Sequence, residues 1–362
     1  MEKVKILVLP GDGIGPEIVD SAKDIIFCLK DLFGMKFELS YYDIGFKALK
    51  EKGTTFPTEI LNLAQKFHGL ILGPVSHLDY PPPEKGGINP SAEIVTKLDL
   101  YANLRPAKSR KGILTKNGKS IDLLIVRQRT EGFYSDRNMY IGSGEYMPTP
   151  DIALSTRKIT RYESERIAKV AFEQAMGRNK KVTAVHKANV FRISDGLFIE
   201  SVRKIRKRYP DIHYNEELVD ATAANLIRNS DDYDVIVTTN MFGDILSDEA
   251  SEISGSLGIG AGINFGEKLV VAQAQHGSAP DLAGKNIANP SSIILSVSMM
   301  FAWIGHKYKI NDIIECSKLI DKSMDFVLSD KKLRTKDLGG NLSTKEFTKN
   351  LISVISKVNK TI

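Results

Sequence analysis

Two carboxylates four residues apart are the strongest candidates for chemistry in this chain. Asp244 and Asp248 follow the β-branched run Val235-Ile236-Val237, which predicts a short buried strand, and the segment that carries them has a helical pattern. Residues four apart lie on one face of a helix, where two like charges are unfavourable unless a cation lies between them. The pair therefore predicts a metal site, and a solvated acidic face is the alternative.

Three cationic residues follow strand-like segments and could hold the carboxylates of a substrate. Arg105 and Arg127 each lie near the end of such a segment, and Lys187 follows another. A guanidinium binds a carboxylate through two parallel hydrogen bonds, and ligands gather at strand ends in α/β domains. A surface ion pair is the alternative for each arginine. Lys187 lies between apolar residues, so burial could lower its pKa and let it act as a base.

Two further residues could serve either chemistry or structure. Asp220 begins a helix predicted over residues 221–228, a position where capping the helix is the simplest role. Tyr134 lies in a polar turn beside glycine and could donate a proton, with a structural tyrosine as the alternative.

Two glycine-containing segments resemble nucleotide-binding loops without matching them. The glycines at positions 11, 13 and 15 fail the dinucleotide fingerprint, which would place glycine at position 16, where Pro16 stands. The segment 276–286 fails the P-loop pattern because Ala279 replaces its first glycine and Asn286 follows the lysine. A standard Rossmann fingerprint is therefore excluded.

The elements that must position these residues alternate between strands and helices. Strands are predicted near residues 4–9, 36–42, 69–72, 121–127, 182–185 and 235–237, with a helix from about residue 16 to 33 after the first. Residues 73–90 are rich in proline and glycine and predict a long surface loop. Residues 255–266 are dense in glycine, and the chain after them is predicted to be mainly helical, apart from a loop at 276–290 and a turn at 337–340. The pattern indicates the α/β class.

Length and composition restrict the class of protein further. With 362 residues, 42% hydrophobic and 26% charged, the chain has the size of two domains and the composition of a soluble globular protein. A net charge of +6 is modest, and the basic stretch at 203–208 is interrupted at helical spacing. That spacing favours a solvated helix face over a nucleic-acid surface.

Cysteine content and apolar runs indicate a cytoplasmic protein. The two cysteines, Cys28 and Cys316, lie in apolar helical contexts and argue against a disulfide framework. The first apolar run is too short for a signal peptide, and no run of 18 apolar residues follows, so no membrane association is expected.

Taken together, the motifs resemble the β-decarboxylating dehydrogenases, a family that includes isopropylmalate, isocitrate, homoisocitrate and tartrate dehydrogenases. The resemblance covers nearly the whole chain in the order of the family's motifs. The matching segments are LPGDGIGPE at 9–17, LDLYANLRPAK at 98–108, IVRQRTEGFYSDRN at 125–138, HKANV at 186–190, TTNMFGDILSDEAS at 238–251, HGSAPDLAGKNIANP at 276–290 and DLGGNLST at 337–344.

This resemblance implies an isopropylmalate/isocitrate dehydrogenase-like fold that is α/β, has two domains and is not a Rossmann fold. The first domain is expected to be discontinuous, with residues 1–100 and 255–362, and the second to span residues 101–254. It also implies a homodimer with shared active sites and a dimer arm near residues 135–160.

The resemblance assigns roles to the candidate residues. Asp244 and Asp248, with Asp220 from the neighbouring subunit, are expected to bind Mg²⁺ or Mn²⁺, which prefer carboxylate oxygens. Lys187, also from the neighbour, is expected to take the proton of the substrate's 2-hydroxyl, and Tyr134 to protonate the enol carbon left after CO₂ departs. Both roles call for pKa values nearer neutrality than the free side chains have.

Binding residues follow from the same comparison. Asp281 is expected to accept hydrogen bonds from the adenine ribose, which favours NAD over NADP because a 2′-phosphate would meet its charge. NADP-dependent relatives carry Lys-Tyr in place of Asp281-Leu282. The substrate residues are expected to be Ser91, Arg105, Arg127, Arg129 and Asn189, and the cofactor residues Ile14, Asn240, His276, Gly277, Ser278, Ala279, Asp281 and Asn289.

Two departures from the family leave the substrate open. Val95 stands where members usually carry an arginine ten residues before the counterpart of Arg105, and the usual Arg-Glu-Asn or Arg-Glu-Leu has become Arg127-Gln128-Arg129. We expect Arg129 to supply part of the missing charge.

The substrate could be 3-isopropylmalate, homoisocitrate or isocitrate, since the segment 87–95 lacks the leucines of isopropylmalate enzymes but is apolar at its end. Tartrate or malate dehydrogenation is an alternative. A catalytically weak regulatory subunit of a hetero-oligomer is another, motivated by the two departures.

Overall fold

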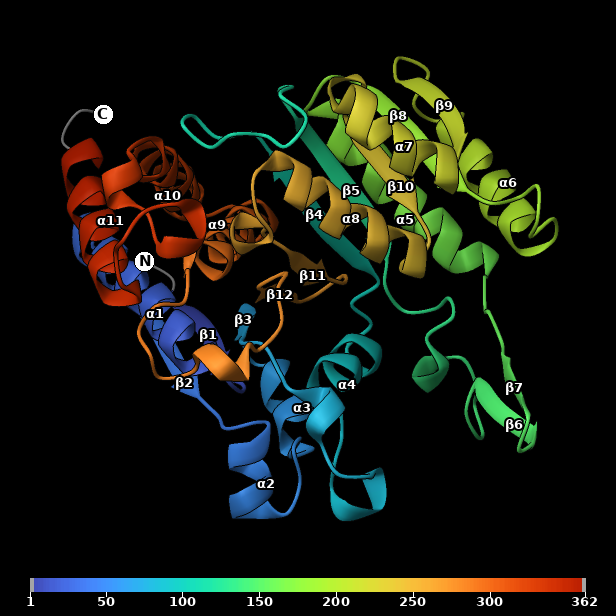
Figure 1. Ribbon diagram of the computed structural model, residues 1–362, viewed down its shortest axis with the longest axis horizontal. Coiled ribbons are helices and arrows are strands. Elements are labelled where there is room, and N and C mark those ends of the chain that lie inside the picture. The colour runs from blue at the N-terminus through green and yellow to red at the C-terminus, as the bar shows by residue number, and fades with distance from the viewer. Residues whose placement is uncertain (1–2, 360–362) are drawn as a thin grey trace. The chain divides into compact units, whose positions relative to one another are not determined.

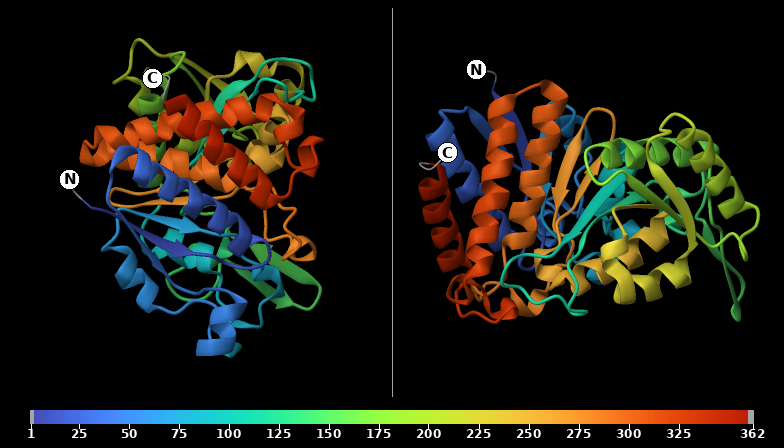
Figure 2. Two further views of the ribbon diagram at one scale, coloured as in Figure 1. Left: turned by 90° about the vertical axis from the view of Figure 1, so that its left-hand side faces the viewer. Right: turned by 90° about the horizontal axis from the view of Figure 1, so that it is seen from above.

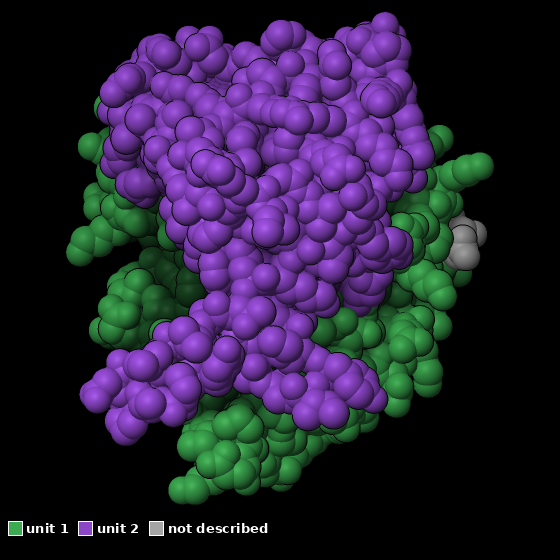
Figure 3. All heavy atoms as spheres, turned by 90° about the vertical axis from the view of Figure 1, so that its right-hand side faces the viewer, with its two compact units in different colours: residues 1–98, 110–114, 255–362 green, residues 99–109, 115–254 purple. Residues whose placement is uncertain are grey.

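The computed structural model describes residues 3–359, apart from the side chain of Ser135 (Figure 1). The chain forms two compact units, coloured separately in Figure 3. Unit 1 comprises residues 1–98, 110–114 and 255–362, and unit 2 comprises residues 99–109 and 115–254.

Unit 1 contains a mostly parallel sheet. Its strands occur in the order β2-β1-β3-β12-β11; the first four run parallel and β11 runs antiparallel to β12. The residues of β1 and β3 are nearly all apolar and buried, as expected when helices cover both faces of a parallel sheet. The strand bounds are β1 (Val4–Leu9), β2 (Phe37–Tyr41), β3 (Gly69–Leu72), β11 (Ile263–Phe265) and β12 (Val270–Gln273).

Four long helices of unit 1 pack against one another. In Figure 2 α1 lies beside the three C-terminal helices, and contacts join α1 to α9 and α11 and α10 to both. No helix in residues 3–359 is both long enough and apolar enough to cross a bilayer. The four long helices are α1 (Gly15–Phe33), α9 (Ser291–Tyr308), α10 (Asn311–Ser329) and α11 (Thr344–Val358). Unit 1 also contains the shorter helices α2 (Phe46–Lys52), α3 (Glu59–Ala64) and α4 (Pro90–Lys97).

Unit 2 contains five paired strands, in the order β4-β5-β10-β8-β9. β4 pairs antiparallel with β5, and the other four strands are parallel. The carboxyl ends of these four strands therefore lie at one edge of the sheet, where ligands bind in open α/β sheets. The bounds are β4 (Ala102–Lys108), β5 (Asp122–Gln128), β8 (Lys181–His186), β9 (His213–Leu218) and β10 (Val235–Thr238).

Helices cover both faces of this sheet. α5 (Arg161–Met176) and α6 (Ser194–Arg206) lie on one face, and α7 (Val219–Asn229) and α8 (Asn240–Ser254) lie on the other (Figures 1 and 2). The Thr160 side chain caps α5 by accepting a hydrogen bond from the Glu163 backbone N–H. Leu246 and Ala250 of α8 pack with β5 and β10 in a buried apolar cluster.

A hairpin extends away from the body of unit 2. It consists of β6 (Glu145–Thr149) and β7 (Ile152–Ser155), which pair antiparallel as a separate sheet (Figures 1 and 2). All nine residues of the two strands are exposed in the single chain, including four large apolar side chains. Exposed apolar residues at this density indicate an interaction surface.

The α/β class predicted from the alternating pattern is confirmed, and three local expectations differ from the structure. The chain beyond residue 255 contains the strands β11 and β12, which are too short and too close to glycine to be recognised from the sequence. Residues 73–90 include two short 3₁₀ helices, at 77–79 and 83–85. Asp220 does not cap α7, because the helix begins at Val219, two residues earlier than predicted, with Leu218 as the cap.

Candidate active site

The predicted catalytic and metal-binding residues of unit 2 all lie where parallel strands end. Arg127 is the next-to-last residue of strand β5. Helix α8, which follows β10, carries Asp244. Lys187 comes directly after β8, and Asp220 lies in the first turn of α7 after β9. One edge of the sheet thus bears every one of these residues.

Asp244 is the centre of a partly buried polar cluster. Its carboxylate accepts hydrogen bonds from Arg127 Nη1 at 2.5 Å, Tyr134 OH at 2.6 Å and Arg105 Nη1 at 3.2 Å. Burial alone would raise the pKa of the Asp244 carboxyl, but Arg127 and Arg105 lower that pKa to about 2. Asp244 is therefore an anion at neutral pH and presents ligand oxygens to a cation.

Asp248 joins the same cluster from the next turn of α8. The Arg105 Nη1 atom lies 3.0 Å from Asp248 Oδ1 and 2.8 Å from Ser247 Oγ, in addition to its contact with Asp244. The i, i+4 spacing thus brings both carboxylates to one cationic nitrogen. Two carboxylates with room for water suit Mg²⁺ or Mn²⁺.

The third predicted metal ligand is not part of this cluster in a single chain. Within residues 3–359 no group of three His, Cys, Asp or Glu side chains is arranged to hold a metal ion. Asp220 instead pairs with Lys187, with 2.5 Å between Lys187 Nζ and Asp220 Oδ1. This contact lowers the pKa of the exposed Asp220 carboxyl. The prediction that Asp220 comes from a neighbouring subunit stays open.

Arg127 is held by side chains on three sides. It is 1% exposed, and Nε donates to Asn240 Oδ1 at 2.9 Å while Nη2 donates to Tyr134 OH at 2.8 Å. Burial and the neighbouring Arg105 lower its pKa to about 10, so it stays protonated at neutral pH. Gly243 leaves the space for its side chain, since a Cβ there would lie 2.6 Å from Arg127 Cγ.

Asn240 has a positioning role that the sequence did not indicate. It was predicted to contact the cofactor, but its side chain is fully buried. Besides accepting from Arg127, it donates to the backbone carbonyls of Arg129 at 3.0 Å and Glu131 at 2.7 Å. Its amide therefore fixes the loop after β5 to the start of α8. Only long-range contacts reveal this role.

The pKa of the Tyr134 hydroxyl is shifted in the direction opposite to the one expected. Burial raises the pKa of Tyr134; Arg127 opposes this and Asp244 reinforces it, so the pKa lies above its ordinary value rather than nearer neutrality. A cation bound to Asp244 would oppose the carboxylate's effect and shift the hydroxyl toward ionisation.

A buried ion pair positions the backbone of Lys187. The Lys187 N–H donates to Asp195 Oδ2 at 2.6 Å, and Asp195 Oδ1 accepts from Arg157 Nη1 at 2.5 Å. Asp195 is fully buried and Arg157 nearly so. Neither was recognised in the sequence, because a single aspartate at a helix start suggests only a cap. Asn189, a predicted substrate residue, is exposed and has no hydrogen-bond partner among the described residues.

In unit 1 the predicted cofactor residues surround the loop that follows β1. The Ile14 N–H donates to the Ser278 carbonyl at 2.8 Å, and Ser278 Oγ lies 2.8 Å from Ser76 Oγ. Gly13 has φ +57°, and a Cβ there would lie 2.0 Å from Ser278 O, so the close approach of the two loops requires glycine. These contacts fix the loop 276–281 beside the start of α1.

The remaining predicted cofactor residues lie on or next to that loop. Burial lowers the pKa of His276, whose Nδ1 lies 3.0 Å from the Gly277 carbonyl. Ala279 adopts a left-handed conformation (φ +38°) before the 3₁₀ turn that carries Asp281. Asn289 is buried and donates to Asp337 Oδ2 at 2.9 Å.

Two features of this loop fit a dinucleotide. Gly277 is exposed, with no atom within 4 Å of the position of a Cβ, so a phosphate could approach its backbone closely. Asp281 is exposed, and the described residues offer its carboxylate no partner, which suits an acceptor for ribose hydroxyls. Ser91, a predicted substrate residue at the start of α4, instead exchanges weak hydrogen bonds with Gln273 at 3.3 and 3.4 Å.

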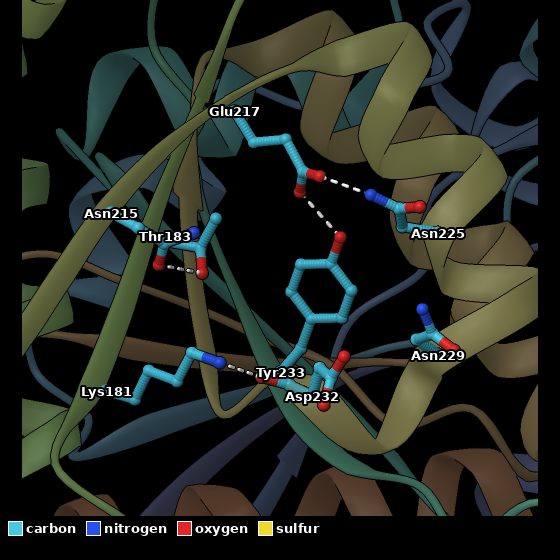
Figure 4. A pocket seen from close by; sticks show the side chains of 8 residues that line it. All are labelled: Lys181, Thr183, Asn215, Glu217, Asn225, Asn229, Asp232 and Tyr233. Atoms are coloured by element: carbon cyan, nitrogen blue, oxygen red, sulfur yellow. Dashed lines mark hydrogen bonds between the residues drawn. The ribbon is translucent and has the colours of Figure 1, made fainter.

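Away from these residues, unit 2 has a polar recess among β8, β9 and α7 (Figure 4). Its centre is Glu217, which accepts from Tyr233 OH and Asn225 Nδ2, each at 2.5 Å. On the opposite wall Thr183 Oγ1 donates to Asn215 Oδ1 at 2.8 Å. The described residues that line the recess include none of the predicted site residues, and its central groups bond one another.

Comparison with known proteins finds similarity along nearly the whole chain. The family model described as isocitrate/isopropylmalate dehydrogenase matches residues 5–351. A 3-isopropylmalate dehydrogenase of Sulfurisphaera tokodaii is 42% identical over 94% of this chain and 96% of the relative. A homoisocitrate dehydrogenase of Methanocaldococcus jannaschii is 40% identical over 98% of each. The crystal structure of isocitrate dehydrogenase from Methylococcus capsulatus aligns with a TM-score of 0.85 at 35% identity, covering 97% of this chain and 99% of the other.

Proposed function

Since this chain belongs to the isocitrate/isopropylmalate dehydrogenase family, we propose that it catalyses the NAD-dependent, divalent-metal-dependent oxidative decarboxylation of a 2-hydroxy acid that bears a 3-carboxylate. Family membership makes it an oxidoreductase that acts on CH–OH groups, and it confirms the predicted fold class. The substrates named for the relatives are 3-isopropylmalate, homoisocitrate and isocitrate.

The arrangement of Asp244, Asp248 and Arg105 is the observation that carries this proposal. Two carboxylates that converge on one cationic nitrogen leave a position where a divalent ion and a carboxylate substrate could replace the Arg105 contacts. The guanidinium of Arg105 could then turn to the substrate. A purely structural ion pair would not need Arg127 and Tyr134 on the same carboxylate.

Each protein group then has one task. Arg105 and Arg127 bind carboxylates, and Asp244 and Asp248 hold the metal. The metal would polarise the 2-hydroxyl and stabilise negative charge on that oxygen, and NAD would accept the hydride. Lys187 of the partner subunit takes the hydroxyl proton as the hydride leaves C2. The bond from C3 to its carboxylate breaks to release CO₂, and Tyr134 gives its proton to C3.

The test is a panel assay of the purified protein. NADH formation is measured with Mg²⁺ or Mn²⁺ against isopropylmalate, isocitrate, homoisocitrate, tartrate and malate. We expect turnover with at least one of the first three and loss of it on addition of a chelator. Asp244→Asn should abolish turnover while far-UV circular dichroism is unchanged. Absence of turnover with all five substrates would instead favour the regulatory-subunit alternative.

A further inference from the structure

Four arginines of unit 2 gather around the proposed proton donor. Three of them, Arg127, Arg129 and Arg137, place their guanidinium carbons 5.6, 5.9 and 4.9 Å from the centroid of the Tyr134 ring. Arg105 joins them from β4 through Asp244. A cluster of like charges in a partly buried site is unfavourable unless anions lie among them.

Three of these four arginines have acidic partners. Arg105 pairs with Asp244 and Asp248, and Arg127 also pairs with Asp244. Arg137 donates to its neighbour Asp136 through Nε and Nη2, both at 2.9 Å.

Arg129 is the exception among the described residues. Its guanidinium has no hydrogen bond or ion pair to any of them, although the side chain is partly buried. Burial and the nearby Arg127 and Arg137 lower its pKa. Such a charge is costly to bury without a partner.

The backbone of Arg129, in contrast, is firmly held. Its N–H donates to the Tyr101 carbonyl at 2.9 Å, and its carbonyl accepts from Asn240 Nδ2 and Arg137 Nη1, each at 3.0 Å. The side chain therefore starts from a fixed point, and its guanidinium lies over the Tyr134 ring. A cation without a partner next to a reactive group is available to an anionic ligand.

We infer that Arg129 binds a carboxylate in the hydroxy-dicarboxylate part of the substrate, the part shared by isopropylmalate, isocitrate and homoisocitrate. The inference rests on the proposed function. Tyr134 is proposed to protonate C3, so an anion on the arginine beside its ring lies near the reacting carbons. Three of the five N–H groups of Arg127 already bond Asn240, Asp244 and Tyr134, whereas all five of Arg129 are free of partners among the described residues.

The experiment compares Arg129→Met with a matched control, Arg161→Met. Both variants remove one guanidinium from unit 2, but Arg161 lies on the surface in an exposed pair with Glu200. Arg129→Met should raise KM for the substrate found in the panel by about 10- to 150-fold, the range for a lost hydrogen bond to a charged group. Arg129→Lys should recover part of the loss, and Arg161→Met should leave KM unchanged. A KM for Arg129→Met within twofold of wild type would overturn the inference.

Malate decides which carboxylate is bound, because it contains the shared part and lacks a third substituent. Its inhibition constant should rise in Arg129→Met by the same factor as KM. An unchanged inhibition constant together with a raised KM would place the contact at a third carboxylate and contradict the inference.

Calorimetric titration with malate and Mg²⁺ separates this inference from the proposed function. If the wild type turns over no substrate but binds malate, and Arg129→Met binds it much more weakly, the proposed function fails and the carboxylate site stands. Thermal unfolding of the ligand-free protein excludes a structural role. Removal of an unpaired buried charge should leave Tm unchanged or raise it. A clear fall in Tm would mean that Arg129 supports the fold.

Discussion

At the scale of single residues, Asp281 is expected to decide between the two nicotinamide cofactors. Its carboxylate is exposed at the start of a 3₁₀ turn and has no partner among the described residues. A ribose with free hydroxyls can donate to it, whereas a 2′-phosphate would be repelled. We expect a higher kcat/KM with NAD than with NADP, and Asp281→Lys combined with Leu282→Tyr should reverse the order.

The cofactor prediction has a matched control. Asp281→Asn removes the charge but keeps an acceptor oxygen, so it should weaken the preference for NAD without reversing it. A wild-type kcat/KM that is higher with NADP would show that Asp281 does not read the ribose.

Glu131 predicts a pH dependence of stability near neutrality. Its side chain is 2% exposed; Oε1 accepts from the Thr160 N–H at 2.8 Å, and Oε2 has no partner among the described residues. Burial raises the pKa of Glu131 to about 7. The free side chain titrates near about 4.3, so the folded protein holds an extra proton between these two values. The stabilisation of the folded protein by this proton is complete below the pKa of the free side chain. It is lost as pH rises through the pKa of Glu131 in the folded protein.

The corresponding measurement is urea unfolding at several pH values. This group should reduce the free energy of unfolding by up to about 3 kcal/mol between pH 5 and 8. Glu131→Gln keeps the neutral form and should flatten that part of the profile. Identical slopes for the variant and the wild type would rule out Glu131 as the source.

At the scale of elements, the ion pair of Asp195 and Arg157 connects the start of α6 to the segment between β7 and α5. Arg157 also lies over the rings of Phe133, Phe191 and Phe242, with its guanidinium carbon 5.5, 5.0 and 5.1 Å from their centroids. Removal of one partner leaves an uncompensated charge in this apolar enclosure. Asp195→Asn should therefore cost about 3 to 5 kcal/mol of unfolding free energy, measured by urea denaturation.

An exposed ion pair provides the comparison for that variant. Glu200→Gln, which breaks the surface pair with Arg161, should leave the unfolding midpoint unchanged because water replaces the lost contact. Equal effects of the two substitutions would contradict the assigned role of the buried pair.

How well the elements could be predicted depended on their length and their setting. β1 and β3 were predicted within a residue because continuous apolar runs bounded by proline or glycine identify buried strands. The three-residue β11 and four-residue β12 carry too little pattern, and only their pairing with each other and with β3 defines them. Local sequence determines long periodic elements, while short strands depend on their neighbours.

The residues of the candidate site could likewise be predicted only in part. The spacing of Asp244 and Asp248 predicted a shared helix face, and both carboxylates do meet one nitrogen of Arg105. The roles of Asn240 and Asp195 could not be predicted, because their partners lie far away in the sequence and only the folded chain brings them together. Patterns reveal residue types with reactive chemistry, but the residues that hold them in place require the three-dimensional contacts.

At the scale of the whole molecule, we expect the exposed apolar residues of unit 2 to form the interface of a homodimer. Tyr146, Met147, Ile152 and Leu154 on the hairpin are 44–64% exposed. Ile227 on α7 and Ile245 on α8 are 57% and 58% exposed. Burial of such residues against a second copy would stabilise the assembly. We expect a dimer by light scattering, and Met147→Asp with Ile152→Lys should give a monomer without turnover.

Shared active sites can be tested by mixing two inactive variants. A dimer of Asp244→Asn with Lys187→Ala has one site with both defects and one site with neither, provided that Lys187 acts across the interface. After exchange of subunits the mixture should recover about one quarter of the wild-type activity. No recovery would show that each chain uses its own Lys187.

The discontinuity of unit 1 has a consequence for biosynthesis. When the ribosome has made residues 1–254, unit 2 is complete, but unit 1 still lacks β12, which pairs with β3, and the helices that pack against α1. Because domains fold as units during translation, unit 2 can fold first. Residues 1–98 can complete unit 1 only after residues 255–362 have been made. A stalled or truncated chain would therefore expose the apolar strands β1 and β3. Chaperones would bind the segment with these two strands before any other.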